Sequence, residues 1–115
     1  MTAIPKAILK AITARDGHRS AWTGDDVDTL VPHDRGNRGM GGRSVYDVAN
    51  YVWLEADING FIESRADWAE EARRRGIKIS RFSDPRLVPI NHAVHGDVFL
   101  DNQGGITPAS DVPKF

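Results

Sequence analysis

The residues of this sequence best suited to chemistry are a His-Asp pair, two asparagines and a loop of glycines and arginines. His33 and Asp34 directly precede the loop RGNRGMGGR (35–43), and Asn50 and Asn59 follow it. A metal-dependent phosphodiesterase needs a hard cation on the scissile phosphate, held by oxygen or imidazole ligands, with a base to activate water. His33, Asp34 and Asn59 could converge on such an ion from a strand end and the next helix. The alternative for the His-Asp pair is a hydrogen-bonded turn.

Basic residues are concentrated in two stretches, although the chain carries a net charge of −1. Arg35, Arg38 and Arg43 lie among the glycines of the loop and are candidates for contacts with DNA phosphates. The second stretch contains Arg73, Arg74, Arg75, Lys78 and Arg81. A solvated helix end is its alternative interpretation, because helix C-termini favour cations. Local patches of this kind are compatible with a nucleic-acid partner, which the net charge by itself argues against.

Two further histidines suggest a second metal site. His92 and His95 have the H-x-x-H spacing that suits ligation from one face of a helix. Pro89 and Gly96 instead favour a strand and a turn there, and residues i and i+3 of a strand face opposite sides. We therefore expect both histidines to lie on the surface.

The pattern of apolar and turn residues predicts one mixed α+β domain over residues 1–115. An N-terminal helix is expected within 1–18, starting at Ile4-Pro5 and stopping at Gly17, and a short strand at 29–31 ends at Pro32. A helix from Val52 to Ser64 follows the glycine loop, although Val52 and Trp53 could also end a strand.

The second half of the chain is expected to hold a further helix and a small antiparallel sheet. The run Ser64-Arg65-Ala66-Asp67 resembles a capping box and predicts a helix that ends at Gly76. Residues 65–107 should contain this helix and the C-terminal strands, including an alternating segment at 77–80 and a strand at 97–100. Residues 108–115 should form a loose tail.

Composition excludes several classes of protein. Without any cysteine, the chain has no disulfide framework, thiol nucleophile or Cys-ligated zinc site. No apolar run approaches the roughly 20 residues of a membrane span, and the N-terminus lacks a secretion signal. These features predict a cytoplasmic protein with no membrane partner, and they leave its oligomeric state open.

The motifs also resemble a known family, the small HNH endonuclease-like proteins of actinobacterial phages. The resemblance rests on five runs: RDGHRSAWTG (15–24), TLVPHDR (29–35), NRGMGGR (37–43), AN (49–50) and INGFIES (58–64). Its most specific part is the Arg-Gly-Met-Gly-Gly loop in register with Ala49-Asn50. The resemblance implies a ββα-metal core over residues 29–64 and, in the cell, the cytoplasm of a bacterial host.

The resemblance assigns roles to the candidate site residues. It makes His33 and Asn59 ligands of a divalent metal, Mg²⁺ or Mn²⁺, and it makes Asn50 a brace of the loop. Asp34 stands where the family has its general-base histidine, and an aspartate is a far weaker base but a good metal ligand. An alternative keeps His33 as the base and Asp34 as the ligand, although neighbouring strand residues point to opposite faces. Ser20 replaces a family cysteine, so no zinc knuckle is expected.

Two functions follow from this interpretation. The first is a metal-dependent HNH-type DNA endonuclease or nickase, in which the aspartate at position 34 predicts weak or absent cleavage. The second is a catalytically dead nuclease scaffold that serves as a binding module for DNA or for a host protein.

Overall fold

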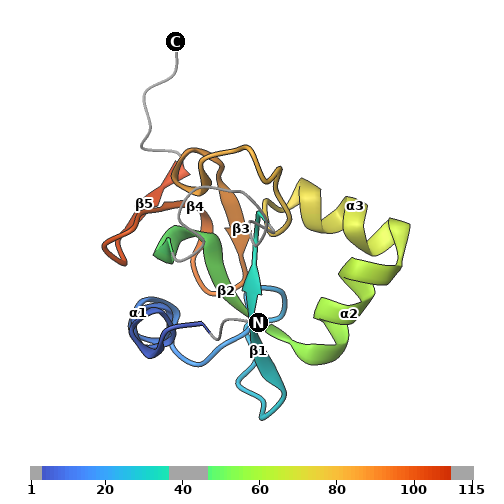
Figure 1. The fold of residues 1–115 in the computed structure, drawn as a ribbon, viewed down its shortest axis with the longest axis horizontal. Helices are drawn as coiled ribbons and strands as arrows, with labels where there is room; N and C mark the ends of the chain where they lie inside the picture. The colour runs from blue at the N-terminus through green and yellow to red at the C-terminus, as the bar shows by residue number, and fades with distance from the viewer. Residues whose placement is uncertain (1–3, 37–46, 110–115) are drawn as a thin grey trace.

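Three α-helices and two small antiparallel sheets form the described part of the chain, residues 4–36 and 47–109 of a computed structural model (Figure 1). In chain order the elements are α1 (Lys6–Asp16), β1 (Leu30–Asp34), the 3-10 helix η1 (Val48–Asn50), β2 (Tyr51–Glu55), α2 (Ala56–Ser64), α3 (Ala66–Arg74), the 3-10 helix η2 (Pro85–Leu87), β3 (Ile90–His92), β4 (Gly96–Leu100) and β5 (Ile106–Pro108). The predicted α+β class is confirmed.

The first sheet pairs β1 with β2 and is followed directly by α2. Leu30 lies opposite Glu55 and Asp34 lies opposite Tyr51. The prediction that the first strand ends at Pro32 is wrong, because β1 continues to Asp34. A proline is tolerated here because, among the described residues, this sheet has only two strands, so β1 is an edge strand.

Residues 51–55 form a strand where the sequence predicted the start of a helix. All five residues of β2 are buried. Val52 and Leu54 pack into a cluster with α2, α3 and the second sheet, whereas Tyr51 and Trp53 pack into a second cluster with α1. Since both faces of β2 are covered, its apolar run shows no alternation. In Figure 1, α1 accordingly lies on one side of the β1–β2 ribbon and the α2–α3 pair on the other.

The junction between α2 and α3 does not use the predicted capping box. Ser64 is the last residue of α2, and its hydroxyl donates to the carbonyl oxygen of Gly60 at 2.8 Å. The N-cap of α3 is Arg65, which makes no side-chain capping bond. Its guanidinium lies 4.3 Å from the centre of the Phe61 ring instead.

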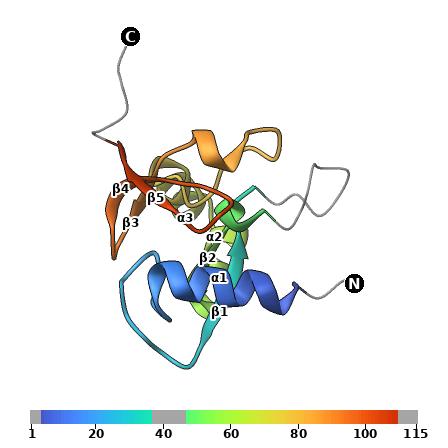
Figure 2. The ribbon, with the colours of Figure 1, turned by 90° about the vertical axis from the view of Figure 1, so that its left-hand side faces the viewer.

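The second sheet has the order β3-β4-β5 and lies above α1 in both views (Figures 1 and 2). The predicted strand at 97–100 is confirmed within β4. Residues 77–80 are not a strand of either sheet, but the amide of Ile79 donates to the Arg35 carbonyl just beyond β1 at 2.9 Å. Pro108 lies in β5 opposite Val98, so the loose tail predicted for residues 108–115 begins too early in the sequence. Residues 110–115 lie outside the described part of the chain.

Candidate functional site

His33 and Asn59 are brought together by the strand, strand and helix that follow one another in β1, β2 and α2. The His33 side chain points off β1 into the protein and is only 3% exposed. Its Nδ1 lies 2.8 Å from Oδ1 of Asn59, and its Nε2 lies 2.9 Å from the carbonyl oxygen of Ile77. Both ring nitrogens of His33 are therefore in polar contacts with the protein.

The protonation of His33 follows from these contacts. Burial lowers the pKa of His33 and outweighs the opposing effects of its hydrogen bonds to Ile77 and Asn59, which favours the neutral ring. The carbonyl of Ile77 and Oδ1 of Asn59 are both acceptors, so a neutral ring with a single N–H can donate to only one of them at a time. A metal ion or a substrate proton could reach His33 only after one of these contacts breaks.

Asp34 makes a separate pair with Asn50. The Asn50 amide nitrogen donates to Oδ1 of Asp34 at 2.5 Å, and the Asn50 side-chain oxygen accepts from the backbone N–H of Gly36 at 2.9 Å. Asn50 is fully buried, and its carbonyl also accepts from the Arg35 amide at 2.8 Å. Asn50 thus ties the end of β1 to the start of β2 on the two sides of the glycine loop.

Arg35 is not a phosphate contact, contrary to the sequence prediction. Its side chain is 1% exposed and donates to four carbonyl oxygens inside the protein. Burial, followed by the positive charge of Arg15, lowers the pKa of Arg35 to about 9, which still leaves the guanidinium charged at neutral pH. The other two predicted phosphate contacts, Arg38 and Arg43, lie outside the described residues.

In the second basic stretch, two arginines pair with an acidic side chain, and two other cations line a pocket. Arg74 and Arg75 both bind the carboxylate of Glu71, at 2.6 and 2.7 Å, and these hydrogen bonds lower the pKa of Glu71 to about 2. Arg75 also lies 4.3 Å from the centre of the Trp22 ring. Arg73 and Lys78 instead line a pocket of about 490 Å³. Its other lining residues are Ile79, Ser80, Ser83 and Val88.

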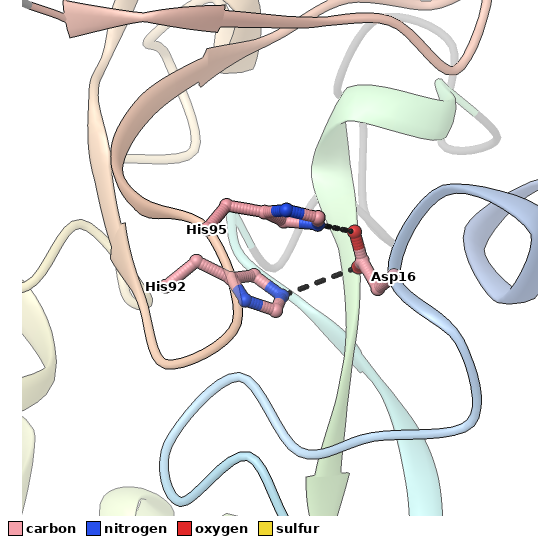
Figure 3. Close-up of side chains that lie close together, drawn as sticks. All are labelled: Asp16, His92 and His95. Carbon is pink, nitrogen blue, oxygen red and sulfur yellow. Dashed lines mark hydrogen bonds and ion pairs between the residues drawn. The ribbon is translucent and has the colours of Figure 1, made fainter.

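The structure corrects the expectation that His92 and His95 are surface residues. The His92 side chain is fully buried and that of His95 is 19% exposed. Both rings point at Asp16, at the end of α1, with Nε2 of His95 2.9 Å from Oδ1 and Nε2 of His92 3.2 Å from Oδ2 (Figure 3). The three residues each offer a ligand atom, all within 4.8 Å of one another, so this group could hold a metal ion.

Asp16 is ionised in this group. Burial by itself would raise the pKa of Asp16, but hydrogen bonds from Arg15 and the contact with His92 outweigh it and hold the pKa far below its usual value. Nε and one terminal nitrogen of Arg15 donate to the two carboxylate oxygens at 2.7 and 2.6 Å. The fully buried carboxylate thus faces a guanidinium on one side and two imidazoles on the other.

The H-x-x-H spacing was the only signal in the sequence for this group. Treating these residues as part of a straight strand, in which residues i and i+3 face opposite sides, was wrong. His92 ends β3 and His95 lies in the turn before Gly96, which has a φ of 77°. The turn reverses the chain, so the two rings come to the same side with their centres 4.8 Å apart. No local pattern pointed to Asp16, which is far away in the sequence.

The fold and these groups define a small α+β domain with two buried polar centres, one at the end of β1 and one between α1 and the β3–β4 hairpin. None of the described helices is long and apolar enough to cross a membrane. Comparisons with protein-family models, curated proteins and solved structures found no match. The similarity to HNH endonuclease-like phage proteins remains a prediction from the motifs.

Proposed function

We propose that this protein binds nucleic acid through the phosphodiester backbone, at the pocket lined by Arg73 and Lys78. The observation that supports this most is the grouping of these two cations with the hydroxyl-bearing Ser80 and Ser83 around one pocket. Arginine, lysine and serine side chains are among the groups that contact phosphate oxygens in protein–DNA complexes. Neither Arg73 nor Lys78 forms an ion pair with another described residue, so both charges remain available to a ligand.

The surroundings of the pocket extend this surface. Arg81 lies 4.9 Å from the centre of the Phe82 ring, and Phe82 is 84% exposed. An exposed aromatic ring beside cations suits the stacking of unpaired bases. Backbone contacts position a protein without selecting a sequence, so we expect weak sequence preference. The net charge of −1 does not oppose this, because phosphate binding depends on the local charge of the contact surface.

The test compares two neighbouring arginines. Arg73→Gln should weaken binding and reduce the slope of log affinity against log salt concentration by about 0.9 on duplex DNA or about 0.7 on a single strand. The matched control is Arg74→Gln, because Arg74 is also exposed but is bound to Glu71. Fluorescence polarisation of labelled oligonucleotides across a KCl series measures both slopes. No binding at low salt, or equal slopes for the two variants, would refute the proposal.

Metal-dependent DNA cleavage at the end of β1 is the second candidate function. It is favoured by the order β1, β2, α2, which sets Nδ1 of His33 2.8 Å from Oδ1 of Asn59, with Asp34 next to His33 in the sequence. Carboxylate and amide oxygens of Asp34 and Asn59 suit Mg²⁺ or Mn²⁺. His33 fits less well, because Ile77 and Asn59 occupy its ring nitrogens. Such an ion would polarise the phosphate, while Asp34 provides only a weak base.

A plasmid assay tests this second function. Supercoiled DNA with Mg²⁺ or Mn²⁺ should be nicked slowly by the natural chain and faster by Asp34→His, since a histidine is the better base near neutral pH. Asn59→Ala should abolish nicking. His18→Ala, which changes an exposed histidine far from this site in the sequence, should leave it unchanged. Absence of cleavage by both the natural chain and Asp34→His with either ion would exclude this function.

A further inference from the structure

We propose that Asp16, His92 and His95 form a binding site for a transition-metal dication of the Zn²⁺ class. Nε2 of His95 lies 2.9 Å from Oδ1 of Asp16 and Nε2 of His92 lies 3.2 Å from Oδ2, and one ligand atom from each residue can be chosen so that all three lie within 4.8 Å of one another. Tetrahedral coordination with bonds of roughly 2.0–2.1 Å places ligand atoms about 3.3 Å apart. The ligand atoms, which lie within 4.8 Å of one another, would therefore close in by at most about 1.5 Å to hold an ion.

The ligand types select the ion. Two imidazole nitrogens and one carboxylate oxygen suit Zn²⁺, Co²⁺, Ni²⁺ or Cu²⁺, whereas Mg²⁺ and Ca²⁺ prefer oxygen ligands throughout. Three protein ligands leave a fourth tetrahedral position. The partly exposed ring of His95 marks the side from which water can reach that position.

The strongest local indication is Nε2 of His92. This nitrogen is buried and has no hydrogen-bond partner among the described residues, because its 3.2 Å approach to Asp16 lacks hydrogen-bond geometry. Buried polar atoms are rarely left in this state. The same atom points towards Asp16 in Figure 3. A metal ion between the rings and the carboxylate would satisfy it.

Two neighbours determine how tightly the site can bind. Arg15 neutralises Asp16 and so weakens the attraction for a cation, but it takes only one of the lone-pair sites on each oxygen. It also donates to the carbonyls of Val48 and Tyr51, so it can remain as an outer partner of a metal-bound carboxylate. We therefore expect reversible binding rather than a permanently held ion.

The second neighbour is Val94, whose amide donates to Nδ1 of His92 at 3.1 Å. This bond places the proton of the neutral ring on Nε2. Ligation through Nε2 moves that proton to Nδ1, and the Val94 amide loses its acceptor. Val94 is 40% exposed, so water can replace the lost bond. Metal binding would then fasten the end of α1 to the β3–β4 hairpin.

The first measurement uses the natural chain with metal alone. Zn²⁺ should bind with a stoichiometry of one and raise the Tm progressively with its concentration. Co²⁺ should give visible absorption bands of a tetrahedral site. In ¹H–¹⁵N spectra of the imidazole rings, His92 and His95 should shift on adding Zn²⁺, while His18 and His33 should not. Absence of binding, or shifts confined to His18 or His33, would overturn the proposal.

The variants separate this site from adventitious binding. His95→Gln removes a partly exposed ligand and should weaken Zn²⁺ binding more than about tenfold. The matched control is His18→Gln, because His18 also faces an aspartate, Asp26, at 2.7 Å but on the surface. Equal affinities for all three proteins, or equal loss in both variants, would overturn the proposal. If His95→Gln does not fold, the ring spectra of the natural chain decide the question.

Discussion

Arg35→Met should lower the free energy of unfolding by roughly 4 kcal/mol, because it leaves three buried carbonyl oxygens and one partly buried one without their donor, at about 1 kcal/mol or more for each. The guanidinium donates to Gly76, Ala49, Pro85 and Val88 over 2.8–3.1 Å. Small domains are stable by only about 5–15 kcal/mol, so this one change would remove a large share. Urea unfolding followed by circular dichroism measures it.

The effect is expected to be large because Arg35 joins segments that no sheet holds together. Its four acceptors lie in η1, in η2, and in the turns that follow α3 and η2. Methionine fills a similar volume and avoids a large cavity, so the loss reports on the hydrogen bonds rather than on packing. Removing a buried charge also removes its desolvation penalty. We therefore expect the loss of unfolding free energy to stay near roughly 4 kcal/mol, the sum for four hydrogen bonds at about 1 kcal/mol each.

The matched control is Arg86→Met. Arg86 pairs with Asp84 at 2.7 Å, but its side chain is 53% exposed, and surface ion pairs contribute little to stability. We expect a change within about 0.5 kcal/mol. Equal destabilisation by the two substitutions would show that the buried hydrogen bonds of Arg35 do not stabilise the fold as described.

The sequence predicted those elements that bury one face or carry clear end signals. The helix stopping at Gly17 and the strand at 97–100 are both present. The sequence favoured a helix from Val52 and kept a strand ending at Val52 and Trp53 only as the alternative, because burial on both faces removes the alternation that distinguishes a strand from a helix. The capping box failed for a different reason, since the Ser64 hydroxyl binds within its own helix.

The candidate sites were less predictable, because their partners lie far apart in the chain. The motif placed Arg35 beside a glycine loop, which favours an exposed phosphate contact, but its acceptors are 14 to 53 residues away. The spacing of His92 and His95 carried no information about Asp16, 79 residues before His95. His33 and Asn59 are also 26 residues apart, but the family motif contains both residues and so brought them into one hypothesis.

Gly76→Ala is expected to destabilise the domain by more than about 3 kcal/mol. Gly76 has a φ of 71°, and a Cβ there would lie 2.0 Å from the carbonyl oxygen of Pro89. The left-handed conformation costs a non-glycine residue about 1–2 kcal/mol, and relieving a backbone clash adds roughly 1–3 kcal/mol more. Because the Gly76 carbonyl also accepts from Arg35, displacing this turn would weaken the same buried network.

Gly60→Ala is the matched control and should change stability in the opposite direction. Gly60 is exposed within α2, and a Cβ there would meet no atom within 4 Å. Alanine is favoured over glycine in a helix by about 0.5–1 kcal/mol, so this variant should be more stable than the natural chain. Thermal unfolding of both variants side by side measures the contrast. If Gly76→Ala were as stable as Gly60→Ala, the turn after α3 could not be packed closely against Pro89 as described. The hydrogen bond from Arg35 to the Gly76 carbonyl would then be incorrect as well.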